Sequence, residues 1–302
     1  MSETRSPLHA DLVLVAVTLV AAAGWIFSKE ALSGLPPLLF VGVRFLLAGV
    51  VLALFGWRQL RALDRSGWRG GFIIGFLFSL AMTMWIIGLQ QTTHLGEGGF
   101  ISSLGVVLVP LMGRLFFGER PPPTVWLAMA LALVGFGFLS LGQGFHFEPS
   151  QWLFLATAVI FAFLVNMNGR VVRNVSPVAL SAVQVSVVGF FALPLSLLFE
   201  SWPTSVSAPI LGWLLASALI ATTLRFVLQL YGQSLTSPSH AALILMLEPM
   251  WIALTAAWWF GERMNGQQLV GCSLIFSALL LSRWRVVRDV TRDLLRRSLA
   301  RH

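Results

Sequence analysis

The chain has 302 residues, of which 57% are hydrophobic and only 11% are charged. A soluble domain carries about 25% charged residues, so this composition excludes a soluble protein and predicts an integral membrane protein with lipid as its solvent. The formal net charge of +8 does not indicate nucleic-acid binding, because the arginines fall in short segments between apolar runs and at the C-terminal end, rather than on one basic face. The single cysteine, Cys272, excludes disulfides within the chain and Cys-based metal clusters.

Long apolar runs follow one another along the whole chain. A helix that crosses the hydrocarbon needs about 20 apolar residues, and the runs are continuous rather than alternating, which argues against barrel strands. The first run ends near "AAAG" (Ala21 to Gly24), which resembles a signal-peptide cleavage site, but its flank is barely basic, so we expect a retained helix. The sequence predicts an all-α membrane protein with ten spans at 10–30, 36–56, 70–90, 97–117, 123–142, 151–170, 177–199, 209–231, 238–260 and 266–284.

The arginines between the spans predict the orientation of the chain. They cluster after spans two, four and six and after span ten, whereas the other loops carry only Lys29 and Arg263. By the positive-inside rule, both termini are expected in the cytoplasm, which agrees with an even number of spans. The arginines of these segments are Arg58, Arg61, Arg65, Arg69, Arg120, Arg170, Arg173, Arg283, Arg285, Arg288, Arg292, Arg296, Arg297 and Arg301.

One short motif occurs twice. "LFFGERPPP" (Leu115 to Pro123) and "WWFGERMNGQQ" (Trp258 to Gln268) place Glu119 and Glu262 143 residues apart. Upstream, "PLLFVGVRFLLAG" (37–49) aligns without gaps with "PVALSAVQVSVVG" (177–189). Each half then holds five spans, and because five is odd the second copy must be inverted relative to the first. The motif itself is expected to be structural.

In this motif the glycine ends a helix with positive φ, and Glu and Arg form a local pair before Pro121 or Asn265 starts the next helix. The sequence thus predicts a first repeat at 10–142, a second, inverted repeat at 151–284 and a basic cytoplasmic tail at 285–302.

Two longer stretches carry a family resemblance. "MLEPMWIALTAAWWFGERMNGQQLVGCSLIFSALLL" (Met246 to Leu281) and "AAAGWIFSKEAL" (Ala21 to Leu32) resemble the EamA type of the drug/metabolite transporter superfamily, in its YddG-like branch of amino-acid exporters. The resemblance implies ten helices as two inverted five-helix repeats, a central cavity lined by helices one to four and six to nine, and export of small metabolites. The first half departs from the second, since Val106 stands where the second half has Pro249 and its own proline, Pro110, comes one turn later.

Polar and aromatic residues inside the spans are the candidate substrate contacts. A charge at the centre of a span costs about 2.5–3.5 kcal/mol on insertion scales and needs a reason. Glu248 precedes Pro249, where the helix ladder is broken, and Arg44 has Gln184 as its repeat equivalent. We therefore expect Glu248 and either Arg44 or Arg225 to share the cavity. The candidate substrate-binding residues are Trp25, Arg44, Ser79, Thr83, Trp85, Asn166, Gln184, Arg225, Gln229 and Glu248.

Structural roles compete with these assignments. Glu248 can form an ion pair with an arginine that only holds helices together. Arg225 can extend its charged group to the membrane surface. Asn166 and Asn168 can form hydrogen bonds that only join helices. Arg114 lies near a helix end and receives no site role.

Two classes of function remain open. The first is a secondary transporter that exports amino acids or similar metabolites across the inner membrane by alternating access. The second is a proton-coupled exporter of cationic drugs, in which Glu248 alternates between proton and substrate. The chain lacks a nucleophile–base set, a P-loop or metal-ligand spacing, so no enzymatic activity, cofactor or metal is expected.

The expected partners are a small-molecule substrate and membrane lipid. In the tail, Val287, Val290 and Leu294 recur at helical spacing beside arginines, which is typical of an amphipathic helix on anionic lipid. No nucleic acid is expected, and the chain is expected to be a monomer or a weak homodimer.

Overall fold

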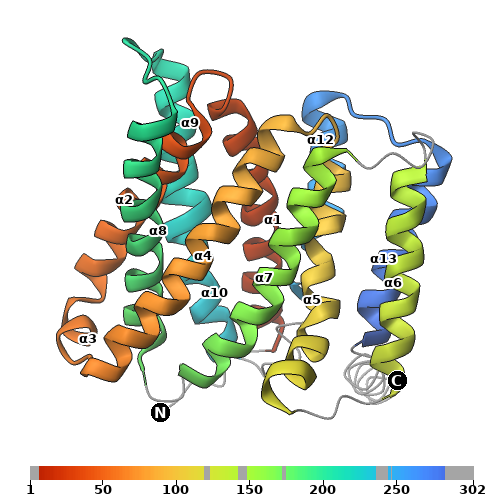
Figure 1. Ribbon diagram of the computed structural model, residues 1–302, viewed down its shortest axis with the longest axis horizontal. Helices are drawn as coiled ribbons and strands as arrows, with labels where there is room; N and C mark the ends of the chain where they lie inside the picture. Colours follow the sequence, from red (N-terminus) through yellow and green to blue (C-terminus); the bar gives the residue numbers. More distant parts are fainter. Residues whose placement is uncertain are drawn as a thin grey trace.

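The protein is a bundle of long helices whose axes run in roughly the same direction, seen side-on in Figure 1, a computed structural model. The structure describes residues 7–118, 123–141, 148–171, 175–235, 244–245 and 247–282. Its helices are α1 (Pro7–Ala31), α2 (Pro37–Phe55), α3 (Trp57–Arg61), α4 (Arg65–Gln91), α5 (Leu95–Phe117), α6 (Pro123–Leu141), α7 (Pro149–Val171), α8 (Pro177–Phe199), α9 (Ala208–Ala218), η1 (Leu219–Leu224), α10 (Arg225–Ser234), α12 (Glu248–Phe260) and α13 (Gly266–Ser282).

The lengths of these helices fit a membrane. In the described part of the chain, 7 helices are long and apolar enough to cross a bilayer, and Trp126–Phe138 and Gly266–Leu281 are shorter apolar helices. The prediction of an all-helical membrane protein is therefore confirmed. The ninth span, predicted at 238–260, is described as a helix only from Glu248 in α12 onward, with residues 244–245 before it.

Proline sets the start of many of these helices. Proline is the first residue of α1, α2, α6, α7 and α8. This position suits proline because its fixed φ matches the helix and its missing N–H would have no partner in the first turn. Glycine sets two of the ends, since Gly118 and Gly261 both have φ of 67°. The prediction that the repeated motif ends its helix with a left-handed glycine is confirmed at both copies.

The two segments aligned by sequence, α2 and α8, pack on each other in a reciprocal way. A Cβ on Gly49 would meet Ser186 Oγ at 2.4 Å, and a Cβ on Gly189 would meet the Leu46 backbone nitrogen at 2.7 Å. Residues 46 and 186 are as far apart in sequence as residues 49 and 189. Contacts that exchange their partners in this way are the contacts that a two-fold relation between the segments produces.

The helices gather around α1. It packs on α9, α10 and α12, while α4 and α5 pack on α7, and α6 pairs with α13 at one side of the molecule (Figure 1). We call the end of the bundle where α5 begins the upper end, as drawn in Figure 1, and the end where α3 lies the lower end. α1 begins and α13 ends at the lower end (Figure 1).

The predicted eighth span, 209–231, differs from a simple helix. It is interrupted by η1, a π-helix at Leu219–Leu224, before α10 begins at Arg225. Apolar periodicity does not reveal this irregularity, because a single wide turn leaves the hydrophobic run unbroken. The short helix α3 was also not predicted, since its five residues are too few to show a period.

Candidate functional site

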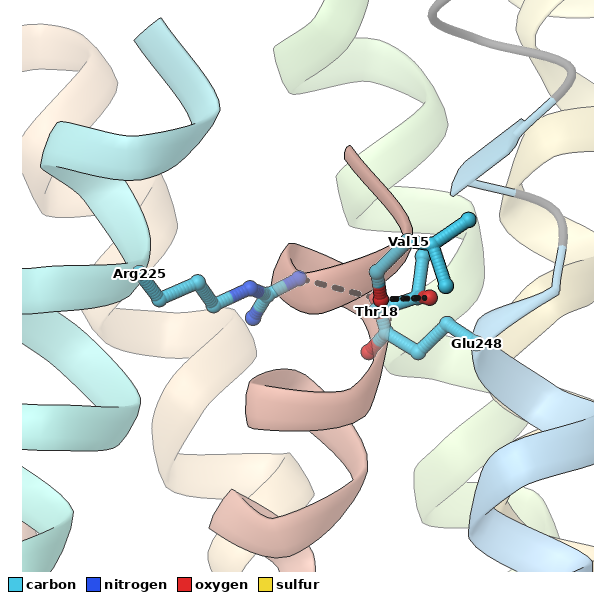
Figure 2. Close-up of polar contacts among 4 residues, drawn as sticks. All are labelled: Val15, Thr18, Arg225 and Glu248. Carbon is cyan, nitrogen blue, oxygen red and sulfur yellow. Dashed lines mark hydrogen bonds and ion pairs between the residues drawn. The ribbon is translucent and has the colours of Figure 1, made fainter. Parts of the chain in front are cut away.

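An ion pair joins α10 to α12. Arg225 Nη2 lies 2.9 Å from Glu248 Oε2, and the two side chains are 31% and 23% exposed. Figure 2 shows the two side chains pointing toward one another from α10 and α12, with α1 between these helices. Of the two arginines that the sequence left open as the partner of Glu248, the structure pairs it with Arg225.

Glu248 begins a helix, whereas Arg225 follows a π-turn inside a longer one, Ala208–Gln229. Glu248 opens α12 and Pro249 follows it, with Leu247 as a turn residue before them. Glu248 therefore lies at the start of α12, at the point where the sequence predicts that Pro249 breaks the helix. The physical reason is Pro249, which lacks the N–H that a continuous helix needs at that point. Arg225 is the first residue after η1.

The π-helix is held by its own hydroxyls. Thr222 Oγ1 donates to the Ser217 carbonyl at 2.9 Å, and Thr223 Oγ1 donates to the Ala218 carbonyl at 3.0 Å. Each bond spans five residues, the spacing of the π-helix itself. A π-turn often marks a functional position in a helix. Here it directly precedes the arginine of the ion pair.

Arg44 lies beside this turn. It is 8% exposed, and its Nε donates to Thr222 Oγ1 at 2.8 Å while its Nη1 donates to Ser28 Oγ at 2.9 Å. The guanidinium also lies over the ring of Phe45, at 5.3 Å from the centroid. Thr222 precedes Arg225 by three residues, so Arg44 is bonded to the turn that leads into the ion pair. Arg44 therefore shares a neighbourhood with the ion pair but has hydroxyls, not a carboxylate, as its described partners.

Two further donors near the pair have no described acceptor. Arg225 Nε and Trp251 Nε1 are both buried without a hydrogen-bond partner among the described residues. Trp251 lies one turn after Glu248 on α12. Buried donors without an acceptor are costly, and the described residues leave these two donors unmatched.

Thr18 on α1 lies near the ion pair, but its hydroxyl bonds within α1. Its hydroxyl, fully buried, donates to the Val15 carbonyl of the same helix at 2.7 Å (Figure 2). The Thr18 hydroxyl therefore uses its proton for a hydrogen bond within α1 and does not donate it to the ion pair.

The two tryptophans singled out from the sequence contact each other. The rings of Trp25 and Trp85 meet edge to face at 5.0 Å, and Trp25 also contacts Phe154 at 5.7 Å. Both tryptophans are 7% exposed. They form an aromatic cluster of α1, α4 and α7, and a role in closing over a substrate stays a prediction.

The neutral candidates divide into two groups. Asn166 Nδ2 donates to the Val109 carbonyl of α5 at 2.9 Å, and Gln184 Nε2 donates to Asn168 Oδ1 at 2.7 Å, so these residues join helices. Ser79 is buried on α4. The remaining two candidates, Thr83 and Gln229, are half-buried. The structure therefore brings Arg44, Arg225 and Glu248 together, while Asn166 and Gln184 serve helix contacts of their own.

The class of the protein follows from its match to a family profile. The profile of the EamA-like transporter family matches residues 8–141 and again 149–284. The chain belongs to the EamA-like transporter family. It is therefore a secondary transporter with two EamA repeats, and not an enzyme.

Relatives of this EamA-like protein include several transporters. It is 31% identical over 279 residues to an uncharacterized transporter of Archaeoglobus fulgidus, covering 92% of this chain and 87% of the other. It is 28% identical to the chloramphenicol-sensitive protein RarD of Pseudomonas aeruginosa, over 70% of this chain and 68% of that one. A protein crystal structure with 17% identity superposes with a TM-score of 0.67 over 93% of this chain and 97% of the other, which shows the fold.

The repeated motif of this EamA-like chain does more than the sequence predicts. Glu262 Oε1 accepts the Leu95 N–H at 2.8 Å, and its Oε2 accepts the Gly96 N–H at 3.3 Å. The carboxylate thus caps α5, a helix of the other repeat, where the helix dipole favours a negative charge. The predicted local pair between Glu262 and Arg263 is wrong in this described copy, because both carboxylate oxygens are used by α5. The first copy, Glu119 and Arg120, lies outside the described residues.

Sequence reasoning also missed Glu97. This carboxylate is 7% exposed in the first turn of α5, and it accepts hydrogen bonds from the side-chain amides of Gln151 and Gln268. Nearby, Lys29 Nζ donates to the Thr92 carbonyl at 2.6 Å and the Leu89 carbonyl at 2.8 Å at the end of α4. An acidic residue in a predicted span was the available signal for Glu97. These contacts fasten the upper ends of α1, α4 and α5 to their neighbours.

No metal site emerges from the described part of the chain, where no group of three His, Cys, Asp or Glu side chains is placed to hold an ion.

Proposed function

We propose that the chain exports amino acids and related small metabolites across the inner membrane by alternating access between two inverted five-helix repeats. The substrate site in this proposal is the region around the Arg225–Glu248 pair, Arg44 and the π-turn. The observation that carries it is the ion pair itself, which joins α10 to α12 across α1, with Glu248 at the start of α12 and Arg225 directly after the π-turn. Interrupted helices that place charged groups and free backbone groups around a site are typical of secondary transporters.

The chemistry of the site suits a substrate with a carboxylate and an ammonium group. Two guanidinium groups and two unpaired buried donors supply hydrogen bonds to a carboxylate. Glu248 uses Oε2 for Arg225, which leaves Oε1 for a cationic group. The partial exposure of the pair keeps it accessible to a small molecule.

The reciprocal packing of α2 and α8 supports the inverted arrangement. An inverted repeat places equivalent segments around a two-fold axis in the membrane plane, and it gives two related conformations that open to opposite sides. The arginine-rich α3 lies at the same end as the start of α1 and the end of α13 (Figure 1). By the positive-inside rule this lower end is cytoplasmic.

The alternative function, proton-coupled export of cationic drugs, has less support. Such a mechanism normally uses a buried carboxylate without a fixed counter-ion. Glu248 instead bonds to Arg225, and the second arginine lies close by. A cationic drug has no carboxylate to offset the guanidinium groups of Arg225 and Arg44, whereas an amino acid does.

Counterflow in proteoliposomes tests the proposal. Purified protein is assayed with amino acids, nucleosides and cationic dyes as separate classes of substrate. We expect exchange of at least one amino acid and none of the dyes. Exchange of dyes alone would favour the alternative function and overturn this one.

Thiol labelling tests the topology. Single cysteines are placed in the 58–68 segment, in the 286–302 tail and at position 146, in a background that lacks Cys272. In intact cells the first two are expected to be shielded from an impermeant reagent, while position 146 is labelled. Labelling of the tail from outside would contradict the orientation and with it the inverted arrangement.

A further inference from the structure

The charges near the site do not cancel. Arg225 and Glu248 neutralise one another, whereas Arg44 keeps one formal positive charge with only Ser28 and Thr222 hydroxyls as described hydrogen-bond partners. Two guanidinium groups against one carboxylate leave the site with one unit of positive charge.

Among the described residues, Glu248 is the one carboxylate in an ion pair near Arg44, and it is paired with Arg225. Glu262 is engaged by the N–H groups of α5, and Glu97 by two glutamine amides, both at the upper end. The segment 236–243 precedes α12 in the chain and contains neither Asp nor Glu. In the described part of the chain, the positive charge of Arg44 therefore has no carboxylate partner.

A buried charge without a partner is expensive, because the hydroxyls that contact it do not replace the water it has lost. The guanidinium of Arg44 nevertheless has a fixed orientation, because both of its acceptors are held by hydrogen bonds of their own. Ser28, one of its acceptors, donates its own hydroxyl to the Gly24 carbonyl at 2.6 Å, which fixes the direction of its lone pairs. The other acceptor, Thr222, is fixed by its bond to the Ser217 carbonyl.

The guanidinium of Arg44 retains hydrogen-bonding capacity. Nε and Nη1 are used by the two hydroxyls, while no described residue accepts a hydrogen bond from Nη2. An arginine whose Nη2 keeps its N–H groups is suited to a carboxylate, which arginine binds with two N–H groups in a planar arrangement.

We infer that Arg44 is the carboxylate-binding residue of the transport site and that the substrate carries one net negative charge, with acidic amino acids as the representative class. This inference rests on the proposed export of amino acids and narrows it. A neutral amino acid would leave the site at one positive charge, whereas an acidic amino acid brings the occupied site to zero. Its ammonium group contacts Glu248 Oε1, and its second carboxylate contacts the unpaired donors Arg225 Nε and Trp251 Nε1.

Matched pairs of substrates test the net charge. Aspartate and asparagine have nearly the same shape, as do glutamate and glutamine, and each pair differs by one charge. In counterflow with the wild-type protein, we expect the acidic member of at least one pair to exchange about tenfold faster or more, corresponding to about 1.4 kcal/mol. Equal exchange of both members would overturn the inference while leaving amino-acid export standing.

Other outcomes separate the two proposals further. Exchange of a simple monocarboxylate such as lactate, which carries one negative charge and no ammonium group, with no exchange of any amino acid, would uphold the anionic substrate and overturn amino-acid export. Exchange of cationic dyes alone would overturn both.

Variants of Arg44 test the residue. Removing a hydrogen-bonded charge from an ion pair costs about 2–5 kcal/mol, so Arg44→Gln is expected to slow exchange of the acidic substrate by roughly thirtyfold or more. The ratio of acidic to neutral exchange should fall towards one. Arg44→Lys keeps the charge and should retain part of the preference. An unchanged ratio in Arg44→Gln would overturn the assignment.

Arg114→Gln is the matched control. Arg114 is an exposed arginine near the end of α5 that lies 5.2 Å from the centroid of the Trp126 ring, so its loss removes a charge far along the helix from the site. We expect wild-type exchange from it. If Arg44→Gln is not recovered as folded protein, the wild-type protein still decides the matter. Its thermal midpoint in detergent should rise with aspartate or glutamate more than with their amides, and an equal rise would contradict the inference.

Discussion

The two halves of the chain use the same position for different chemistry. Arg44 of α2 donates to Ser28 of α1 at 2.9 Å. Its equivalent in the gap-free alignment, Gln184 of α8, donates to Asn168 of α7 at 2.7 Å, and residue 168 is the equivalent of residue 28. The bond is thus repeated between corresponding helices, but only the first-half version carries a charge.

At a second pair of equivalent positions, the charged residue lies in the second half instead of the first. Glu248 in the second half aligns with Gly105 in the first, by the register of the repeated Gly-Glu-Arg motif. A Cβ on Gly105 would meet the Ala158 carbonyl oxygen at 3.0 Å, so α5 packs closely on α7 where α12 instead carries the ion pair. The two halves therefore share one frame, but at each pair of matched positions only one half carries a charge, Arg44 in the first half and Glu248 in the second.

Breaking the ion pair should have the largest effect. Losing one partner of a buried pair costs about 3–5 kcal/mol. Because this pair is partly exposed, we expect Glu248→Gln to lower the free energy of unfolding by about 1–3 kcal/mol, and to abolish most counterflow. The measurements are thermal unfolding in detergent and counterflow.

The double variant Arg225→Gln with Glu248→Gln should regain most of the stability, since no lone charge remains, but not the transport. A double variant less stable than Glu248→Gln would show that the pair is not the relevant coupling. Full transport by all three variants would contradict the site assignment.

The reciprocal contact of α2 and α8 should respond unequally in the two halves. A methyl group on Gly189 meets a backbone nitrogen at 2.7 Å, whereas one on Gly49 meets a serine hydroxyl that can rotate away, with the Ser186 Cα at 3.2 Å behind it. Overpacking costs about 1–3 kcal/mol. We expect Gly189→Ala to destabilise by that amount and Gly49→Ala by less, in thermal unfolding.

Gly137→Ala provides the control, because a Cβ there meets nothing within 4 Å. It should be neutral or slightly stabilising, since alanine favours a helix over glycine by about 1 kcal/mol. If Gly49→Ala and Gly189→Ala lower the stability by the same amount, α2 and α8 respond by moving apart as rigid helices, and the predicted difference between the two glycines is wrong.

The cap from the repeated motif should have a moderate effect. Replacing a side chain that caps a helix N-terminus costs about 0.5–2 kcal/mol, so Glu262→Ala should lower stability by about 1 kcal/mol. Arg263→Ala, in the same turn, should change little. If both copies of the motif have one role, Glu119→Ala should match Glu262→Ala in thermal unfolding. A loss at Arg263 as large as that at Glu262 would revive the local Glu–Arg pair.

The neutral copy of the repeated bond should matter least. Hydrogen bonds between membrane helices contribute about 0.6 kcal/mol on average, so Gln184→Leu should cost about that much in thermal unfolding. Its ratio of acidic to neutral substrate exchange should equal that of the wild type, in contrast to Arg44→Gln. A changed ratio in Gln184→Leu would place the second-half bond in the transport site as well.

The sequence by itself determined the class, most of the helices and their repetition. Composition required lipid as the solvent, and long apolar runs marked where helices lie because each must span the same hydrocarbon thickness. The repeated motif and the aligned segments 37–49 and 177–189 identified the two halves, since a duplicated gene retains its register. Chain-local chemistry fixed the helix ends, where Gly118 and Gly261 adopt the positive φ that glycine permits.

Only the tertiary structure decided which polar groups meet. In the sequence, Arg44 and Arg225 were equal candidates for the ion-pair partner of Glu248. The structure pairs Glu248 with Arg225, because α10 and α12 both pack on α1. The cap that Glu262 places on α5 joins residues 167 positions apart, and no local pattern encodes that distance. The π-turn at Leu219–Leu224 likewise leaves no mark on hydrophobic periodicity, yet it sets where Thr222 and Arg225 lie. Hydrophobicity places a helix in the membrane, but packing between helices sets the partners of its polar side chains.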